Sequence, residues 1–190
     1  MSGHEPATAE CYMRVMAKDG RARLRADPLE KPPHIVLVDP EIPQNTGNIA
    51  RLAAALDCPL HLVGQLGFRV DEKAVRRAGL DYWHLVRLSR HLDLAHFRNK
   101  VGDARLLYFS AIGRRSYLEV DYRPGDALVF GCESKGLPLD LVDAHPDHTL
   151  ALPTIGGVRS LNLSNAVSIV VYEAMRQLGA FSQERLSLRD

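Results

Sequence analysis

The sequence predicts an α/β protein whose mostly parallel sheet carries helices on both faces. Short apolar runs rich in β-branched residues, such as HIVLVD at 34–39, recur along the chain, and such runs are typical of strands buried on both faces. They alternate with segments whose apolar residues recur at steps of three and four, the spacing of an amphipathic helix. This alternation favours a parallel sheet, because each return to the sheet is made through a crossover helix.

The elements are justified in chain order by these two signals. Strands at 34–39, 59–64 and 84–89 are separated by helices at 46–56 and 71–79, the second of which is expected to end at Gly79 in the left-handed conformation. A helix at 91–100 leads to strands at 104–110 and 127–131. A helix near 138–144, a strand at 148–153 and a last helix with apolar positions from Val167 to Leu178 complete the pattern.

Residues 1–33 differ in composition from the predicted domain at 34–190. The first segment is rich in proline, small residues and basic residues, and we expect a largely disordered extension with a short helix around 9–17. It is interpreted as a solvated linker, with an RNA-binding arm as the alternative.

The bulk composition describes one ordinary globular domain. The chain has 190 residues, of which 46% are hydrophobic and 25% charged, enough for a single substantial core. No apolar run approaches the ~20 residues that span a bilayer, and the N-terminus lacks the apolar segment of a secretory signal. The three cysteines have no metal-type spacing, so we expect reduced thiols and a cytoplasmic protein.

The net charge of +1 argues against a protein that wraps nucleic acid by bulk charge. Arginine nevertheless accounts for 19 of the 24 basic residues. A local RNA-contacting patch would explain this preference, because the planar guanidinium suits phosphate groups and base edges. A high genomic GC content would produce the same bias.

Three polar loops follow predicted strands, at 39–51, 131–138 and 153–165. In a parallel sheet, ligands bind beyond the carboxyl ends of the strands. None of these loops has the glycine pattern of a dinucleotide site, the order of a P-loop or the G-x-S-x-G of a serine hydrolase. The histidines lack metal-type spacing, so no metal is expected. A site made of Asn, Ser, Arg, Gly and backbone suits a cofactor that brings its own reactivity.

Three motifs in these loops resemble those of the SPOUT class of RNA methyltransferases. They are PEIPQNTGNIAR at 40–51, FGCESKGLP at 130–138 and SLNLSNA at 160–166. Within the class the chain is similar to the SpoU-type 2′-O-methyltransferases, and most of all to the TrmL-like subgroup that methylates the ribose of the tRNA wobble nucleotide. RRAGLDY at 76–82 and VVYEAMRQLG at 170–179 resemble that subgroup too.

The resemblance covers about 34–179 and implies a deep C-terminal trefoil knot, an exception to the rule that chains do not thread loops. It also implies a homodimer that binds S-adenosylmethionine in the knotted loops and completes each site across the dimer. The implied reaction is 2′-O-methylation of cytidine or modified uridine at position 34 in the anticodon stem-loop of certain tRNAs. Alternatives are another tRNA position, ribosomal RNA, or a knotted RNA-binding protein without catalysis. The extension at 1–33 departs from the subgroup's pattern.

The resemblance also assigns site residues. The implied cofactor-binding residues are Phe109, Gly131, Glu133, Leu152 and Ser160, and the implied catalytic residues are Asn45, Arg51, Asn162 and Ser164.

Among the catalytic candidates, Arg51 is a poor proton acceptor. It is therefore expected to clamp an RNA phosphate and stabilise the emerging alkoxide. Asn45 is expected in the loop before the helix. One of Asn162 and Ser164 could instead simply cap the last helix.

Further candidates carry a weaker signal. Gly131 is expected to let backbone approach a ligand, and Gly136 to take a positive φ. Lys73, Arg76, Arg77, Tyr82 and Trp83 are candidates for anticodon contacts or, equally, a solvated helix face with core aromatics. Ile155 and Gly156 are further cofactor candidates.

Overall fold

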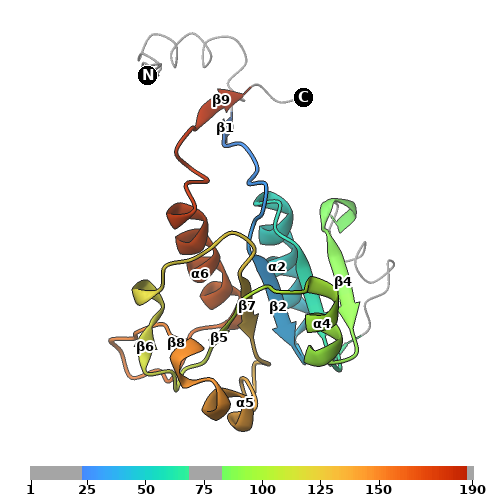
Figure 1. Ribbon diagram of the computed structural model, residues 1–190, viewed down its shortest axis with the longest axis vertical. Coiled ribbons are helices and arrows are strands. Elements are labelled where there is room, and N and C mark those ends of the chain that lie inside the picture. Colours follow the sequence, from blue (N-terminus) through green and yellow to red (C-terminus); the bar gives the residue numbers. More distant parts are fainter. Residues whose placement is uncertain (1–22, 69–82, 188–190) are drawn as a thin grey trace. The chain divides into compact units, whose positions relative to one another are not determined.

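The computed structural model describes residues 23–68 and 83–187 and divides into two compact units. One unit is 28–178, and the other is formed by the two ends of the chain (Figure 1). Between the ends, β1 (Arg23–Arg25) pairs antiparallel with β9 (Arg185–Ser187). The sequence did not predict this pairing. No helix within the described ranges is long and apolar enough to cross a membrane.

The larger unit is built on a seven-stranded sheet in the order β4-β3-β2-β7-β5-β8-β6. The strands are β2 (His34–Val38), β3 (Leu60–Val63), β4 (Leu88–His91), β5 (Leu106–Phe109), β6 (Arg115–Ser116), β7 (Ala127–Phe130) and β8 (Thr149–Ala151). Every neighbouring pair in this sheet is parallel, which confirms the predicted fold class. The trefoil knot stays a prediction, since strand order and register do not test it.

Helices cover both faces of the sheet (Figure 1). They are α2 (Pro43–Ala55), α4 (Leu94–Val101), α5 (Leu139–Ala144) and α6 (Leu163–Gln177), with 3-10 turns η1 (Trp83–Leu85), η2 (Tyr117–Glu119) and η3 (Pro146–His148). Val36 and Val129 share a core cluster with Phe97 of α4 and Val142 of α5. Because strand residues alternate between faces, the intervening strand residues line the opposite face, where α2 and α6 pack against each other and α6 contacts β7.

Several predicted boundaries differ from the structure by a few residues. The strand expected at 84–89 runs from Leu88 to His91, because its register is fixed by pairing with the four residues of β3. The helix expected at 46–56 begins earlier, at Pro43, whose fixed φ suits the first helical position. Asn45 therefore lies in the first turn of α2 and not, as predicted, in the preceding loop. The helix expected at 71–79 lies outside the described residues.

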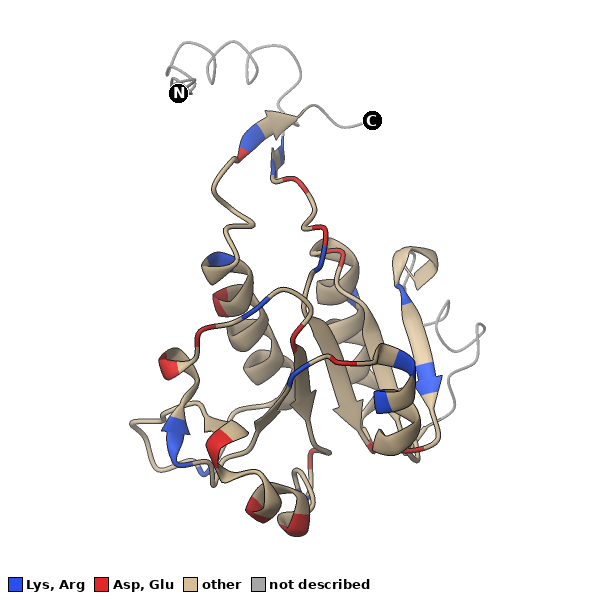
Figure 2. Cartoon of the chain, in the orientation of Figure 1, with Lys and Arg blue, Asp and Glu red and all other residues tan. Residues whose placement is uncertain are grey.

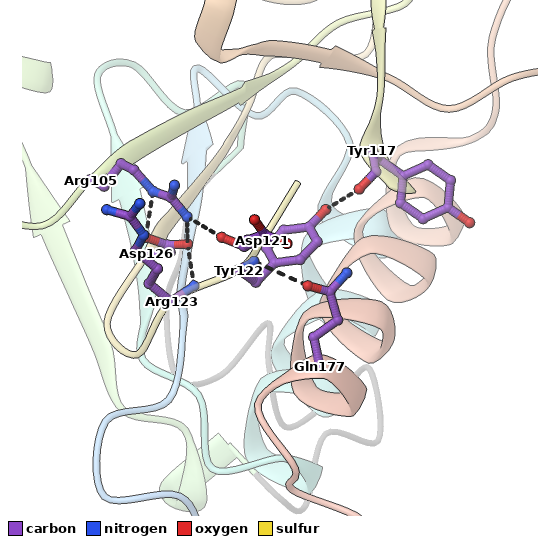
Figure 3. Close-up of polar contacts among 7 residues, drawn as sticks. All are labelled: Arg105, Tyr117, Asp121, Tyr122, Arg123, Asp126 and Gln177. Carbon is purple, nitrogen blue, oxygen red and sulfur yellow. Dashed lines mark hydrogen bonds and ion pairs between the residues drawn. The ribbon is translucent and has the colours of Figure 1, made fainter. Parts of the chain in front are cut away.

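A polar cluster anchors the segment between β6 and β7 (Figure 3). The guanidinium of Arg105 donates to both carboxylate oxygens of Asp126, at 3.0 and 2.6 Å, and Asp126 is only 2% exposed. The same guanidinium donates to the carbonyl of Asp121 at 2.8 Å. The backbone N–H of Tyr122 donates to the side-chain oxygen of Gln177 at 3.1 Å, so this segment also holds the C-terminal end of α6.

Candidate functional site

A cavity of about 820 Å³ lies at the carboxyl ends of β5, β7 and β8. The chain places β3 and β4 on one side of β2 and then crosses to the other half of the sheet, so β2 and β7 flank the point where the strand order reverses. Parallel sheets bind their ligands at such a point. The loops that follow β2, β5, β7 and β8 all contribute to the lining.

The ends of β5 and β7 bring two buried aromatic rings to the cavity. Phe109 and Phe130 stack with ring centroids 4.8 Å apart and an interplanar angle of 16°. They are 6% and 2% exposed, respectively. Both residues belong to the buried core and also line the cavity. The predicted cofactor contact of Phe109 stays a prediction.

Gly131 allows the turn after β7 to fold back tightly. A Cβ atom at Gly131 would lie 2.0 Å from the carbonyl carbon of Gly136. The turn is closed by the N–H of Gly136, which donates to the carbonyl of Cys132 at 2.9 Å. Gly136 has the predicted positive φ, 72°. The chain's own backbone therefore approaches Gly131 closely, and Gly131 also lines the cavity. Its predicted contact with a ligand stays a prediction.

Glu133 ties this turn to the start of α2. Its carboxylate accepts hydrogen bonds from the backbone N–H groups of Glu41 and Ile42, at 2.9 and 3.3 Å, and from Nδ2 of Asn45 at 2.8 Å. Ile42 is the N-cap residue of α2 and has no side-chain cap of its own. A carboxylate at a helix N-terminus satisfies free N–H groups and opposes the positive end of the helix dipole.

Glu41 makes the reciprocal contact from the β2 loop. Its carboxylate accepts from the backbone N–H of Ser134 at 3.0 Å and from the Ser134 hydroxyl at 2.8 Å. These hydrogen bonds hold the pKa of Glu41 below its usual value, and the charge of Lys135 contributes in the same direction. Each of the two segments therefore has a carboxylate that accepts hydrogen bonds from the other, and these contacts hold them together.

Asn162 joins α6 to this arrangement. Its side-chain oxygen accepts from the N–H of Ser164 at 2.9 Å and from the Ser164 hydroxyl at 2.7 Å, and so caps α6. Its Nδ2 donates to Oδ1 of Asn45 at 3.0 Å. A continuous chain of hydrogen bonds therefore runs from Glu133 through Asn45 and Asn162 to Ser164.

The structure brings most of the predicted site residues together. Those that line the cavity are Asn45, Phe109, Gly131, Glu133, Leu152, Ser160 and Asn162. Ser164 is 8% exposed and lies behind Asn162.

Arg51 is the catalytic candidate that the structure places elsewhere. It is an exposed residue of α2 and does not line the cavity of its own chain. Ile155 and Gly156 are exposed and do not line it either. Trp83 is half-buried in η1. The other predicted anticodon contacts, at 73, 76, 77 and 82, lie outside the described residues.

Sequence reasoning missed three charged residues of the site. Lys135 and Arg159 line the cavity, and Glu41 braces the turn beside it. All three fall within or next to the motifs singled out above, but nothing in their spacing separates them from solvated surface charges. Within the described residues, no group of three or more His, Cys, Asp and Glu is placed to hold a metal ion.

Comparison with known proteins identifies the family. A family model described as the SpoU rRNA methylase family matches residues 32–172. The tRNA (cytidine(34)-2′-O)-methyltransferase of Escherichia coli strain K12 is 46% identical over 147 residues, which cover 77% of this chain and 94% of that protein.

Two solved structures share the fold. One, concerned with the 2-OH methylation of C/U34 on tRNA, is 50% identical, has a TM-score of 0.73 and covers 78% of this chain and 97% of its own. The methyltransferase AviRb of Streptomyces viridochromogenes, in complex with AdoMet, is 25% identical, has a TM-score of 0.65 and covers 85% of this chain and 62% of its own. The resemblance of the three motifs is thus confirmed: the chain belongs to the SpoU rRNA methylase family.

Proposed function

We propose that this protein transfers a methyl group from S-adenosylmethionine to the ribose 2′-oxygen of nucleotide 34, a cytidine or modified uridine, in tRNA. The observation that carries the proposal is the cavity at the reversal of strand order, which the three motif segments line with Asn45, Glu133 and Asn162. The choice of nucleotide 34 as the substrate is supported by the relatives whose names give methylation at this position of tRNA. A tRNA substrate implies a cytoplasmic enzyme.

The lining of the cavity fits the proposed cofactor. About 820 Å³ is within the range of small-molecule sites. Phe109 and Leu152 offer apolar contact, and the main chain at Gly131 and the hydroxyl of Ser160 offer polar groups, a combination that suits a nucleoside. When bound, S-adenosylmethionine supplies a methyl group on a positively charged sulfur, so the protein needs only to bind and orient the reactants.

The side chains in the hydrogen-bonded series from Glu133 to Ser164 act by holding one another in position beside the cavity. Asn45 and Asn162 fix each other, and Glu133 and Ser164 fix them in turn. The Glu133 carboxylate already accepts from three donors, which makes it a structural brace and not the acceptor of the ribose proton. Its negative charge also favours a positively charged group in the cavity.

We infer that the partner subunit's Arg51 completes the cavity in a homodimer. Arg51 is exposed on α2 and does not line the cavity of its own chain. The neighbouring helix α6 exposes two large apolar side chains, Ile169 at 40% and Tyr172 at 51%, as an interface helix would. In this arrangement the guanidinium of Arg51 orients the target ribose and stabilises the developing oxyanion.

The proposed function is tested by methyl transfer from labelled S-adenosylmethionine to unmodified total tRNA, with the product mapped to a nucleotide. We expect label on the 2′-oxygen of position 34. Label on another ribose, or on ribosomal RNA, would keep the chemistry and replace the substrate. Binding of the cofactor with no label on any RNA would refute the proposed methyltransferase activity and favour a non-catalytic RNA-binding protein.

The composite site is tested by mixing two inactive variants, Arg51→Ala and Asn162→Ala. A mixed dimer contains one intact site if Arg51 acts across the interface, so random mixing should restore roughly a quarter of the wild-type activity. Each variant alone should stay inactive at the same total concentration. No recovery after subunit exchange, in a mixture shown to contain mixed dimers, would place Arg51 in the site of its own chain.

A further inference from the structure

Two cations of the cavity have no role in the function proposed so far. Lys135 lies in the turn after β7, and Arg159 lies in the loop between β8 and α6. Lys135 is two residues after Glu133, and Arg159 is three residues before Asn162, so each is near in sequence to a member of the hydrogen-bonded series. Both side chains are exposed, whereas Phe109, Phe130 and Gly131 in the same lining are buried. The two cations therefore lie toward solvent and the buried residues lie deeper.

The charge of the lining is unbalanced. Among the described residues, Glu133 is the only acidic residue that lines the cavity, and its carboxylate already accepts hydrogen bonds from three donors. Within the described residues, neither Lys135 nor Arg159 forms an ion pair. The charge of Lys135 reaches Glu41, but that carboxylate is already occupied by two hydrogen bonds from Ser134.

Lys135 is attached to backbone that the structure fixes, and Arg159 is close in sequence to a residue that it fixes. Lys135 follows Ser134, which Glu41 holds, and precedes Gly136, which closes the turn. Arg159 lies three residues before Asn162, which is bonded to Asn45 and Ser164. Two positive groups that line one cavity form a site for an oxyanion, because a cationic donor makes short and strong hydrogen bonds to an anionic oxygen.

We propose that Lys135 and Arg159 together form an anion site at the open side of this cavity, and that its ligand is a backbone phosphate of the RNA substrate. This inference rests on the proposed function and assigns two further substrate-binding residues to the same site. A second source of the same chemistry is the carboxylate of the bound cofactor. The exposure of both cations favours RNA, since a macromolecular substrate approaches from solvent.

Positive charge is not concentrated on one part of the chain outside this site. In the described part of the chain drawn in Figure 2, lysines and arginines are spread over several elements and interleaved with acidic residues. An RNA phosphate near the reacting ribose is thus recognised by a few placed cations and not by bulk charge.

The experiment compares Lys135→Gln, Arg159→Gln and the double variant with the wild-type protein in two binding assays. The first titrates S-adenosylhomocysteine by calorimetry, and the second measures tRNA affinity at several salt concentrations with S-adenosylhomocysteine present. We expect unchanged affinity for S-adenosylhomocysteine in all variants. Each single variant should bind tRNA roughly five- to tenfold more weakly at low salt, and the slope of log K against log salt should fall by about 1 per cation removed.

Matched controls separate this site from general surface charge. Arg90→Gln and Lys100→Gln remove exposed cations of β4 and α4 that do not line the cavity, and their tRNA affinity and salt slope should match the wild type. The charge-preserving pair Arg159→Lys and Lys135→Arg should retain most of the tRNA affinity. Equal losses in the Arg90 and Lys100 variants would overturn the assignment of a specific site.

The remaining outcomes distinguish an RNA phosphate from the cofactor carboxylate as the anion, and they separate a failure of the anion site from a failure of the proposed methyltransferase function. Weaker binding of S-adenosylhomocysteine with an unchanged tRNA salt slope would identify the cofactor carboxylate as the ligand and overturn the RNA phosphate. Wild-type affinities in the double variant would overturn the anion site altogether. Methyl transfer by the wild-type protein is measured in parallel: its absence would refute the proposed function, whereas its presence together with unaltered double-variant binding would refute this inference alone.

Discussion

Asn162 shows how one side chain serves both the fold and the site. Its oxygen accepts two hydrogen bonds from Ser164 at the start of α6, and its nitrogen donates to Asn45. Capping requires an acceptor, which Asp supplies as well as Asn. The contact with Asn45 requires a donor, which an Asp carboxylate lacks. The two functions of this residue can therefore be separated by substitution.

At this scale we predict that Asn162→Asp folds normally and loses activity. The cap survives, so its free energy of unfolding should stay within about 0.5 kcal/mol of wild type, whereas Asn162→Ala should lose about 1 kcal/mol. Both variants should lose methyl transfer, because the link to Asn45 is broken. Urea unfolding and single-turnover methyl transfer measure the two effects. An active Asn162→Asp protein would show that the residue is only a cap.

The turn from Gly131 to Leu137 is the element that shapes the cavity. It leaves β7, folds back within hydrogen-bonding distance and presents Glu133 to α2. Since α2 has no side-chain cap of its own, its start depends on this turn, which is far from it in sequence. Helix and turn thus form one structural unit joined by the Glu133 carboxylate.

We predict that Gly131→Ala disrupts this unit. The new Cβ would lie 2.0 Å from the backbone of Gly136, a clash that only movement of the turn can relieve. The free energy of unfolding should fall by at least about 2 kcal/mol, and affinity for S-adenosylhomocysteine should fall with it. Gly157→Ala is the control, because a Cβ there meets nothing within 4 Å. Equal stability of the two variants, measured by urea unfolding, would contradict the close approach at Gly131.

At the scale of the whole molecule, the three neighbouring strands β2, β3 and β4 each contribute one histidine to a row in the sheet. His34 Nδ1 lies 2.9 Å from His61 Nε2, and His61 Nδ1 lies 3.0 Å from His91 Nε2. Burial, followed by the neighbouring histidines, lowers the pKa of His61 to about 3. Burial also lowers the pKa of His34, with the charge of Arg87 contributing, and the pKa of His91, with His96 and Lys100 contributing.

These pKa shifts predict loss of stability in mild acid. The folded pKa of His61 lies below the unfolded value of 6.5, so below that pH the unfolded chain binds more protons. Above pH 6.5, His61 is neutral in the folded and the unfolded protein, and the free energy of unfolding is not reduced by its protonation. As pH falls from 6.5 toward about 3, only the unfolded chain gains the proton, and the free energy of unfolding falls. His61 alone should lower the free energy of unfolding by up to about 1.4 kcal/mol per pH unit once pH is well below its unfolded pKa.

Urea unfolding between pH 7.5 and 5.0 measures this slope, in a window where most carboxylates stay ionised. His61→Gln should have a shallower slope than the wild type. His84→Gln, which changes an exposed histidine of η1, should keep the wild-type slope. An identical slope in the wild type and His61→Gln would show that the buried row does not control acid stability.

Several site residues were predictable because loops after buried strands carry recognisable chemistry. Gly131, Glu133 and Asn162 fall in motifs that the sequence singles out, and the structure brings all three to one cavity. Lys135 and Arg159 could not be chosen from the sequence, since their exposure beside the cavity is a property of the folded chain. Nor did the sequence place Asn45 in a helix, because polar loop residues and a polar first turn look alike.

The sequence by itself determined the order of the helices and of six of the seven strands in the larger unit's sheet, the parallel sheet and the three polar loops, because side-chain periodicity and strand-end chemistry are local properties. It did not predict the two-residue strand β6 or the strands β1 and β9. Only the tertiary structure decided that β7 inserts between β2 and β5. That strand order brings Glu133 to Asn45, 88 residues away. The pairing of β1 with β9 in the smaller unit also joins segments that are far apart in the chain, and the sequence did not predict it. Contacts between distant segments depend on which elements become neighbours, and that depends on how all the apolar faces are buried together.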